Sequence, residues 1–337
     1  MQQSLVNAFA KNFLGKAPNW YKLIIIIFLA INPIVFFLVN PFAAGWLLIA
    51  EFIFTLAMAL KCYPLPAGGL LAVEAVVLGM TSPASVLHEV EVNLPVILLL
   101  MFMVAGIYFM KEGILFIFSR LIVKIKSKIW LSLVFSVMAA FLSAFLDALT
   151  VTAVIISVAY GCYAIYYKVV ALNKEAALSG GNEGIETASQ DDMDQFRGFL
   201  RNILMHAAVG TALGGAMTQV GEPQNLLIAT TMGWDFIEFF RQCMIISIPV
   251  ALVGFIICIL LEVSKIFGYG YQMPDSVRKV LENDVKEKNA ALDKATIARL
   301  VVQAVVGVIL ILALAFHVAE VGLIGLMVII LLAAFTG

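Results

Sequence analysis

Apolar residues gather along this chain into long runs that short polar segments separate. A run of about 18 or more apolar residues is long enough to cross the hydrocarbon core of a bilayer as a helix. The pattern therefore predicts an all-α polytopic membrane protein. Besides two interrupted runs, the expected spans and shorter apolar pieces are residues 23–39, 43–60, 68–80, 94–110, 244–261, 300–316 and 321–335.

The longest run, residues 131–167, holds a single charged residue, Asp147. A straight helix of this run would be about 55 Å long at roughly 1.5 Å per residue, against about 30 Å of hydrocarbon. We therefore expect the run to break beside Asp147 and to turn back as a re-entrant hairpin. Hydroxyls near the break would satisfy freed backbone groups and offer oxygen atoms to a cation; they belong to Ser143, Thr150 and Thr152.

A second apolar stretch, residues 199–232, is interrupted at residues 220–225. Pro223 lacks a backbone donor and disfavours helix at the residue before it, and Gly221 leaves room for close backbone approach. The break also supplies polar side chains, those of Glu222, Gln224 and Asn225. Two broken elements that each hold one acid predict half of a cation site near the bilayer midplane.

Asp147 and Glu222 are the expected ion-coupling residues, and Asp147 would hold a metal cation transiently. A buried carboxylate can exchange a proton for a metal cation near neutral pH, so one group can serve both ions. The competing interpretations are a helix-end carboxylate at the headgroups for Asp147 and a periplasmic loop after a complete span for Glu222.

Three further titratable residues fall inside apolar stretches and are secondary candidates: Glu51, Glu74 and His206. The two acids suit a structural role, bonded to a neighbouring helix. His206 suits a proton relay or, as the simpler interpretation, a core histidine bonded to a hydroxyl. No Lys or Arg clearly lies inside an apolar stretch, which favours a cation carrier over an anion carrier.

The distribution of basic residues predicts which segments face the cytoplasm. Residues 1–22 carry lysines without acids, and Leu5, Phe9 and Phe13 share one helical face, which predicts a cytoplasmic interfacial helix. Residues 111–130 carry five basic residues against one acid and are expected inside, whereas residues 81–93, without Lys or Arg, are expected to form a loop outside. Residues 168–198 and 262–299 then become cytoplasmic loops, the second partly helical.

Several other classes of protein lack support in this sequence. No basic stripe interleaved with aromatic residues indicates nucleic-acid binding. The four cysteines show no CxxC spacing, and the three histidines are scattered. Neither HExxH nor GxSxG is present, so we expect no enzyme and no cofactor beyond the transported ions.

Long segments of the chain resemble the NhaB sodium/proton antiporters of Gram-negative bacteria. The segments are NFLG at residues 12–15, EFIFTLAMALKCY at 51–63, LLLMFMVAGIYFM at 98–110, AFLSAFLDALT at 140–150, QFRGFL at 195–200 and VGEPQNL at 220–226. The likeness runs along the whole chain and weakens mainly at residues 173–194. It is specific, because long runs match in order.

The resemblance implies the ion transporter superfamily fold, with two inverted repeats that each hold a re-entrant hairpin and a discontinuous helix. AFLDALT, residues 144–150, would be the first hairpin tip, and VGEPQN, residues 220–225, the first helix break. It also implies exchange of cytoplasmic Na⁺ or Li⁺ for external H⁺ across the bacterial inner membrane. The second repeat is absent from this sequence, so we expect a missing C-terminal repeat as a partner, besides lipid and a homodimer.

These expectations divide the chain into five parts. They are an interfacial helix (1–22), N-terminal transmembrane helices (23–130), a first transport repeat (131–261), a charged cytoplasmic loop (262–299) and two final transmembrane helices (300–337). The repeat comprises a re-entrant hairpin (131–167), a cytoplasmic loop (168–198), a broken helix (199–232) and a return helix (244–261). The rival functions are a dicarboxylate, citrate or arsenite carrier of the same architecture, and a non-catalytic membrane subunit.

Overall fold

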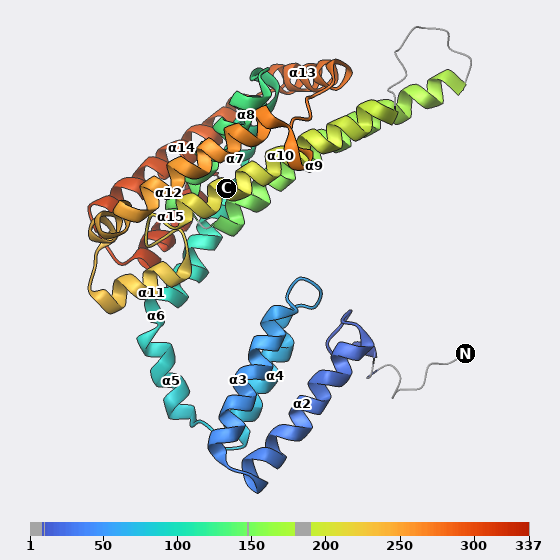
Figure 1. The fold of residues 1–337 in the computed structure, drawn as a ribbon. Coiled ribbons are helices and arrows are strands. Elements are labelled where there is room, and N and C mark those ends of the chain that lie inside the picture. Colours follow the sequence, from blue (N-terminus) through green and yellow to red (C-terminus); the bar gives the residue numbers. More distant parts are fainter. Residues whose placement is uncertain (1–8, 10, 147, 179–189, 337) are drawn as a thin grey trace. The chain divides into compact units, whose positions relative to one another are not determined.

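The computed structural model describes residues 9, 11–146, 148–178 and 190–336, and its regular elements are all helices (Figure 1). The chain forms two compact units, Met1–Val92 and Asn93–Gly337, which are described separately. Asp147 and residues 1–8 and 10 of the expected interfacial helix at residues 1–22 lie outside the described residues.

The first unit is built from α2 (Asn19–Leu38), α3 (Pro41–Ala57), α4 (Pro64–Val77) and α5 (Pro83–Val92). Asn40 caps α3 by accepting a hydrogen bond from Ala43 N at 2.7 Å, and Pro41 occupies the first helical position, where its missing N–H has no cost. Gly79, at a φ of +79°, follows the end of α4. Helices α2, α3 and α4 pack against one another.

The second unit starts with α6 (Leu94–Leu98), a π-helical turn η1 (Leu99–Met103) and α7 (Val104–Lys124). The helices that follow are α8 (Lys128–Phe145), α9 (Ala148–Leu178), α10 (Gln190–Gly215), α11 (Pro223–Met232) and α12 (Phe236–Ser264). After a 3-10 turn η2 (Ile266–Gly268) come α13 (Asp275–Ala290), α14 (Lys294–Ala315) and α15 (Val321–Thr336).

Buried aromatic side chains in the core of the second unit join helices that follow one another in the chain. Phe118 on α7 packs against Phe135 on α8 at a ring-centroid distance of 4.9 Å, and Tyr166 on α9 packs against Phe196 on α10 at 5.7 Å. All four side chains are buried. Helices α8, α10 and α12 form a tight group within this unit (Figure 1).

Five helices in the described part of the chain are long and apolar enough to cross a membrane: α2, α8, Ala148–Ala171 of α9, α12 and α14. A sixth span results if α5 and Leu94–Met103 are counted as one bent element. Apolar side chains on α12 point outward, since Ile245 and Ile246 are 75% and 72% exposed. The protein is therefore a multi-pass membrane protein, as its composition predicts.

Several element boundaries differ from those expected. The segment 81–93, expected as a loop, contains α5, and α7 continues through residues 111–124. Helices α9 and α10 extend well into the expected loop at 168–198. Helix α12 begins at Phe236, eight residues before the expected span at 244–261, because Asp235 caps it, accepting from Glu238 N at 2.8 Å.

Candidate functional site

The longest apolar run is interrupted beside Asp147. Helix α8 ends at Phe145 and α9 begins at Ala148, with Leu146 in extended conformation at φ −125° and ψ 155°. Ser143 lies in the last turn of α8 and Thr150 in the first turn of α9, so these hydroxyls flank the break from both sides.

The second interruption separates α10, which ends at Gly215, from α11, which begins at Pro223. Glu222 has φ −144° and ψ 138°, the extended conformation that a following proline favours. Pro223 therefore does two things: it prevents helix at Glu222, and it starts the next helix at the position where a missing N–H is tolerated.

Helices α8 and α10 approach each other through glycines. A Cβ atom added to Gly210 would lie 2.1 Å from the carbonyl oxygen of Ser136, and one added to Gly214 would lie 1.9 Å from that of Ala140. Any side chain at these glycines would collide with backbone.

The contacts also fix the relative direction of α8 and α10. Each glycine lies opposite a residue 74 positions earlier, and the Thr218 hydroxyl continues the series by donating to the carbonyl of Ala144. A constant offset means that the two helices run in the same direction. Their interrupted ends therefore lie at the same level.

The second break is held together by side chains that satisfy its freed backbone groups. Asn225 donates through its amide nitrogen to the carbonyl oxygens of Gly215 and Thr218, both at 2.8 Å. Gly221 N donates to Thr218 Oγ1 at 3.3 Å. Buried backbone groups without partners are costly, so these bonds allow a non-helical segment inside the bundle.

Two candidate site residues, Ser143 and Glu222, meet at Gly215. A Cβ atom on Gly215 would lie 3.2 Å from Ser143 Oγ and 3.3 Å from Glu222 Oε1. Ser143 is fully buried, and its hydroxyl has no hydrogen-bond partner among the described residues. The absence of a side chain at Gly215 thus leaves space between a hydroxyl and a carboxylate that belong to different breaks.

The other expected site residues do not all lie between the two breaks. Gln224 is exposed on the first turn of α11, whereas Gly221 is buried, and a Cβ added to it would lie 2.5 Å from Gly215 Cα and 2.7 Å from the carbonyl oxygen of Ser143. Thr152 and Thr211 hydroxyls lie 3.3 Å apart, joining α9 to α10. Glu51 and Glu74 belong to the first unit, where both accept hydrogen bonds from Asn32.

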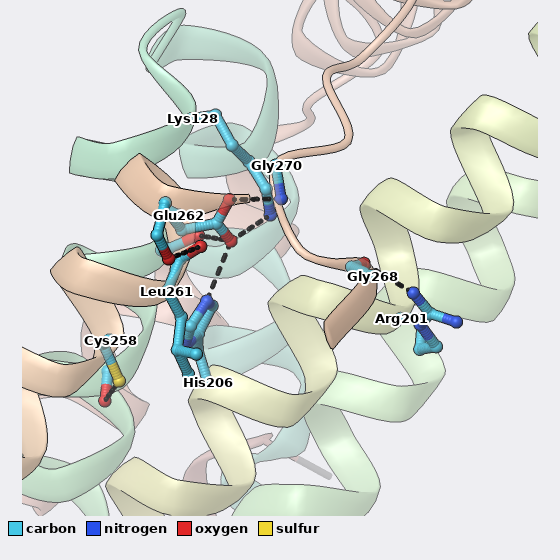
Figure 2. Close-up of polar contacts among 11 residues, drawn as sticks. Lys128, Arg201, His206, Cys258, Leu261, Glu262, Gly268 and Gly270 are labelled. Atoms are coloured by element: carbon cyan, nitrogen blue, oxygen red, sulfur yellow. Dashed lines mark hydrogen bonds and ion pairs between the residues drawn. The ribbon is translucent and has the colours of Figure 1, made fainter. Parts of the chain in front are cut away.

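His206 bonds a carboxylate rather than the hydroxyl that the simpler interpretation expected. Its Nε2 lies 2.8 Å from Glu262 Oε1, and both residues are at least 97% buried (Figure 2). The same oxygen accepts from Ser132 Oγ at 3.0 Å and lies 3.3 Å from Lys128 Nζ. The other oxygen, Glu262 Oε2, accepts from Gly270 N at 3.2 Å.

This network links the start of α8, the interior of α10 and the end of α12 to the segment that follows α12. Lys128 and Ser132 come from α8, His206 from α10 and Glu262 from α12 (Figure 2). Tyr269 packs on the His206 ring at 5.0 Å, and burial raises the pKa of the Tyr269 phenol.

The network is not evident in the sequence, because Glu262 falls at the start of the charged segment 262–299 and Lys128 in the basic segment 111–130. Both residues stand at helix ends in the sequence, where charges are usually solvated. Their pairing depends on the packing of α8 against α12. The sequence indicates one member of the network, His206 inside an apolar stretch, but spacing alone does not name its partner.

The helix-break site offers oxygen ligands for a hard cation. No group of three or more His, Cys, Asp or Glu residues that could hold a metal ion occurs in the described part of the chain. A cation there would depend on a carboxylate with hydroxyl and backbone carbonyl oxygens, the ligand type that hard cations prefer.

Comparison with known proteins connects this arrangement to a family. The family model described as "Bacterial Na+/H+ antiporter B (NhaB)" matches residues 1–337. Proteins named Na(+)/H(+) antiporter NhaB from Vibrio atlanticus (strain LGP32) and Hahella chejuensis (strain KCTC 2396) are each 59% identical to the chain. Both alignments cover the whole chain, and they cover 64% and 68% of those relatives.

A relative of the same name from Klebsiella pneumoniae is 57% identical over all of this chain and 65% of its own length. The chain thus spans about 64% of the first relatives that it matches. No solved structure matches the chain significantly.

Proposed function

We propose that this chain, which belongs to the NhaB family of bacterial Na⁺/H⁺ antiporters, holds part of the ion site used for antiport. At this site Na⁺ and H⁺ compete for the carboxylates at two helix breaks. One observation carries the proposal: α8 and α10 run in parallel and are interrupted at the same level, with Ser143 and Glu222 on either side of Gly215. Asp147 would complete the site from the first break.

The chemistry follows from the expense of charge in a membrane. A carboxylate at this depth is stabilised by a proton or by a cation, and an empty ionised site is disfavoured. Binding of Na⁺ then requires loss of the proton, and binding of the proton expels Na⁺. Two neighbouring carboxylates would titrate as a pair, so the exchange of a proton for Na⁺ is a property of the pair and not of either residue alone.

We further propose that α8 and α9 form the re-entrant hairpin and that α10 and α11 form the discontinuous helix. Two contacts support opposite directions for α9 and α10, because Thr152 meets Thr211 while Tyr166 meets Phe196. Since α8 runs parallel to α10, α9 returns alongside α8. Both ends of the hairpin would then face the cytoplasm, together with the N-terminus.

The same features favour a cation carrier over the anion carriers of similar architecture. Each break carries an acid, Asp147 or Glu222, and no Lys or Arg, whereas an anionic substrate usually needs a basic side chain beside the helix N-termini. The antiporter would exchange cytoplasmic Na⁺ or Li⁺ for external H⁺ in the inner membrane. The part of the relatives that lies beyond this alignment would supply the second repeat, and a homodimer rests on the resemblance alone.

The proposal can be tested with the complete antiporter that contains this sequence, in everted membrane vesicles. Na⁺-dependent proton release should be lost, or its half-maximal Na⁺ concentration raised about tenfold or more, in Glu222→Gln and Asp147→Asn. Glu287→Gln, an exposed acid on α13, is the matched control and should behave as the unmodified protein. Unchanged Na⁺ dependence in both site variants would refute the assignment.

A further inference from the structure

The first unit contains two carboxylates that share one amide group. Asn32, in the middle of α2, donates through Nδ2 to Glu51 Oε2 on α3 and to Glu74 Oε2 on α4, both at 2.8 Å. The two carboxylate oxygens therefore lie no more than twice that distance apart. Asn32 is fully buried, Glu51 is 2% exposed and Glu74 is half-buried.

No basic group of these helices compensates the two acids. Lys22 is the only other charged residue in α2, α3 and α4. It stands ten residues before Asn32, about 15 Å along the helix, and donates to the carbonyl of Lys11 at 2.7 Å. Lys61, in the turn between α3 and α4, is exposed. Two ionised carboxylates here would face each other in a low dielectric without a cation.

Two buried oxygen atoms of the cluster lack hydrogen-bond donors among the described residues. Glu51 Oε1 and Asn32 Oδ1 are both buried, and neither has a partner among the described residues. Each is an acceptor when Glu51 is ionised, so the cluster has more acceptors than donors. Buried polar atoms normally have hydrogen-bond partners, so these two acceptors need a donor. One proton on a carboxyl group removes a charge and adds a donor.

A metal ion fits this cluster poorly. The Asn32 amide nitrogen occupies the space between the two Oε2 atoms and directs its hydrogens at them, which would repel a cation. The unpartnered atoms are only two, whereas hard cations such as Mg²⁺ take about six oxygen ligands. A proton needs a single oxygen atom.

We propose that Asn32, Glu51 and Glu74 form a proton-binding site of the first unit, separate from the helix-break carboxylates. One proton is held by the two carboxyl groups at neutral pH, and the Asn32 amide holds both in place. Because the three residues come from α2, α3 and α4, the bound proton stabilises the packing of these helices. Loss of this proton leaves two negative carboxylates that share the Asn32 amide group, and their repulsion loosens the packing of the three helices.

The site can be tested in the purified complete antiporter with a lipid-soluble carbodiimide, which reacts with protonated carboxyl groups in apolar surroundings. Mass spectrometry of the labelled peptides at neutral pH should find label at Glu51 or Glu74, declining as the pH is raised. Glu91, an exposed acid of α5 in the same unit, should remain unlabelled. Labelling in the unmodified protein does not depend on any variant folding.

Infrared spectroscopy gives a second measurement. The absorption of protonated carboxyl groups at neutral pH should decrease by one group in the double variant Glu51→Gln/Glu74→Gln and stay unchanged in Glu91→Gln. If Asp147 and Glu222 prove not to bind Na⁺, the expected labelling and infrared results at Glu51 and Glu74 do not change, so the two proposals can fail independently. Absence of label at both glutamates, or an unchanged carboxyl absorption in the double variant, would overturn the proton site.

Discussion

Gly214→Ala should disrupt the parallel packing of α8 and α10. The added Cβ would lie 1.9 Å from the carbonyl oxygen of Ala140 and 2.5 Å from its carbonyl carbon. An ordinary van der Waals contact begins at 3.4 Å, so the two helices must separate locally by about 1.5 Å. Backbone atoms cannot rotate away as a flexible side chain can, and the strain must spread along both helices.

The size of the effect follows from this displacement. Overpacking a tight interior commonly costs about 1–3 kcal/mol, and a collision with backbone belongs at the upper end or beyond. Displacement of reacting groups by about 1 Å can lower a rate about 100-fold. Because Gly214 adjoins Gly215, where Ser143 and Glu222 meet, we expect at least that loss in the antiport rate.

Gly161→Ala on α9 is the matched control, since a Cβ there meets no atom within 4 Å. Both changes raise helix propensity by a similar amount, about 0.5–1 kcal/mol, so a difference between them isolates the packing. Antiport is measured in everted vesicles and melting temperature in detergent. Equal antiport and equal melting temperature in the two variants would refute the close approach of α8 and α10.

Three further predictions address single contacts. Ser143→Ala should raise the half-maximal Na⁺ concentration several-fold at unchanged membrane abundance, because a buried hydroxyl ligand is lost; an unchanged Na⁺ titration would exclude that role. Glu262→Gln should lower the melting temperature in detergent by several degrees, since it leaves Lys128 without its buried counter-charge, whereas melting as in the unmodified protein would contradict the pairing. Asp293 caps the start of α14, and hydrogen bonds from Thr296 lower the pKa of its carboxyl group. The ionised cap therefore stabilises α14 above about pH 4, and this stabilisation is lost as the pH falls through the lowered pKa. Asp293→Ala should therefore increase amide exchange in the first turn of α14 at neutral pH and change it little at low pH; equal protection at neutral pH would argue against the cap.

The sequence predicted the positions of both helix breaks because local chemistry determines them. An apolar run too long for a membrane must break, and a proline between glycines and polar residues disfavours continuous helix. Helix ends were less predictable. With Asp235 as its cap, α12 starts eight residues before the expected span at 244–261, and α7 stays helical through its lysine-bearing part.

Partners across helices could not be predicted, because they depend on how helices pack. The pairing of Lys128 with Glu262 joins residues 134 positions apart, and the contact of Gly214 with Ala140 joins residues 74 apart. Small residues such as Gly210, Gly214 and Gly215 are typical of close helix packing, but the sequence does not say which helix approaches them. Asp147, the strongest sequence candidate, lies outside the described residues, so its role stays a prediction.

The central claim is that Na⁺ and H⁺ compete for one site at the paired helix breaks. The most direct test adds Na⁺ to the purified complete antiporter in weakly buffered detergent solution and records the release of protons. The account predicts release that saturates with Na⁺ in the unmodified protein and disappears in the Asp147→Asn/Glu222→Gln double variant. Na⁺ binding without proton release, or unchanged release in that double variant, would contradict it.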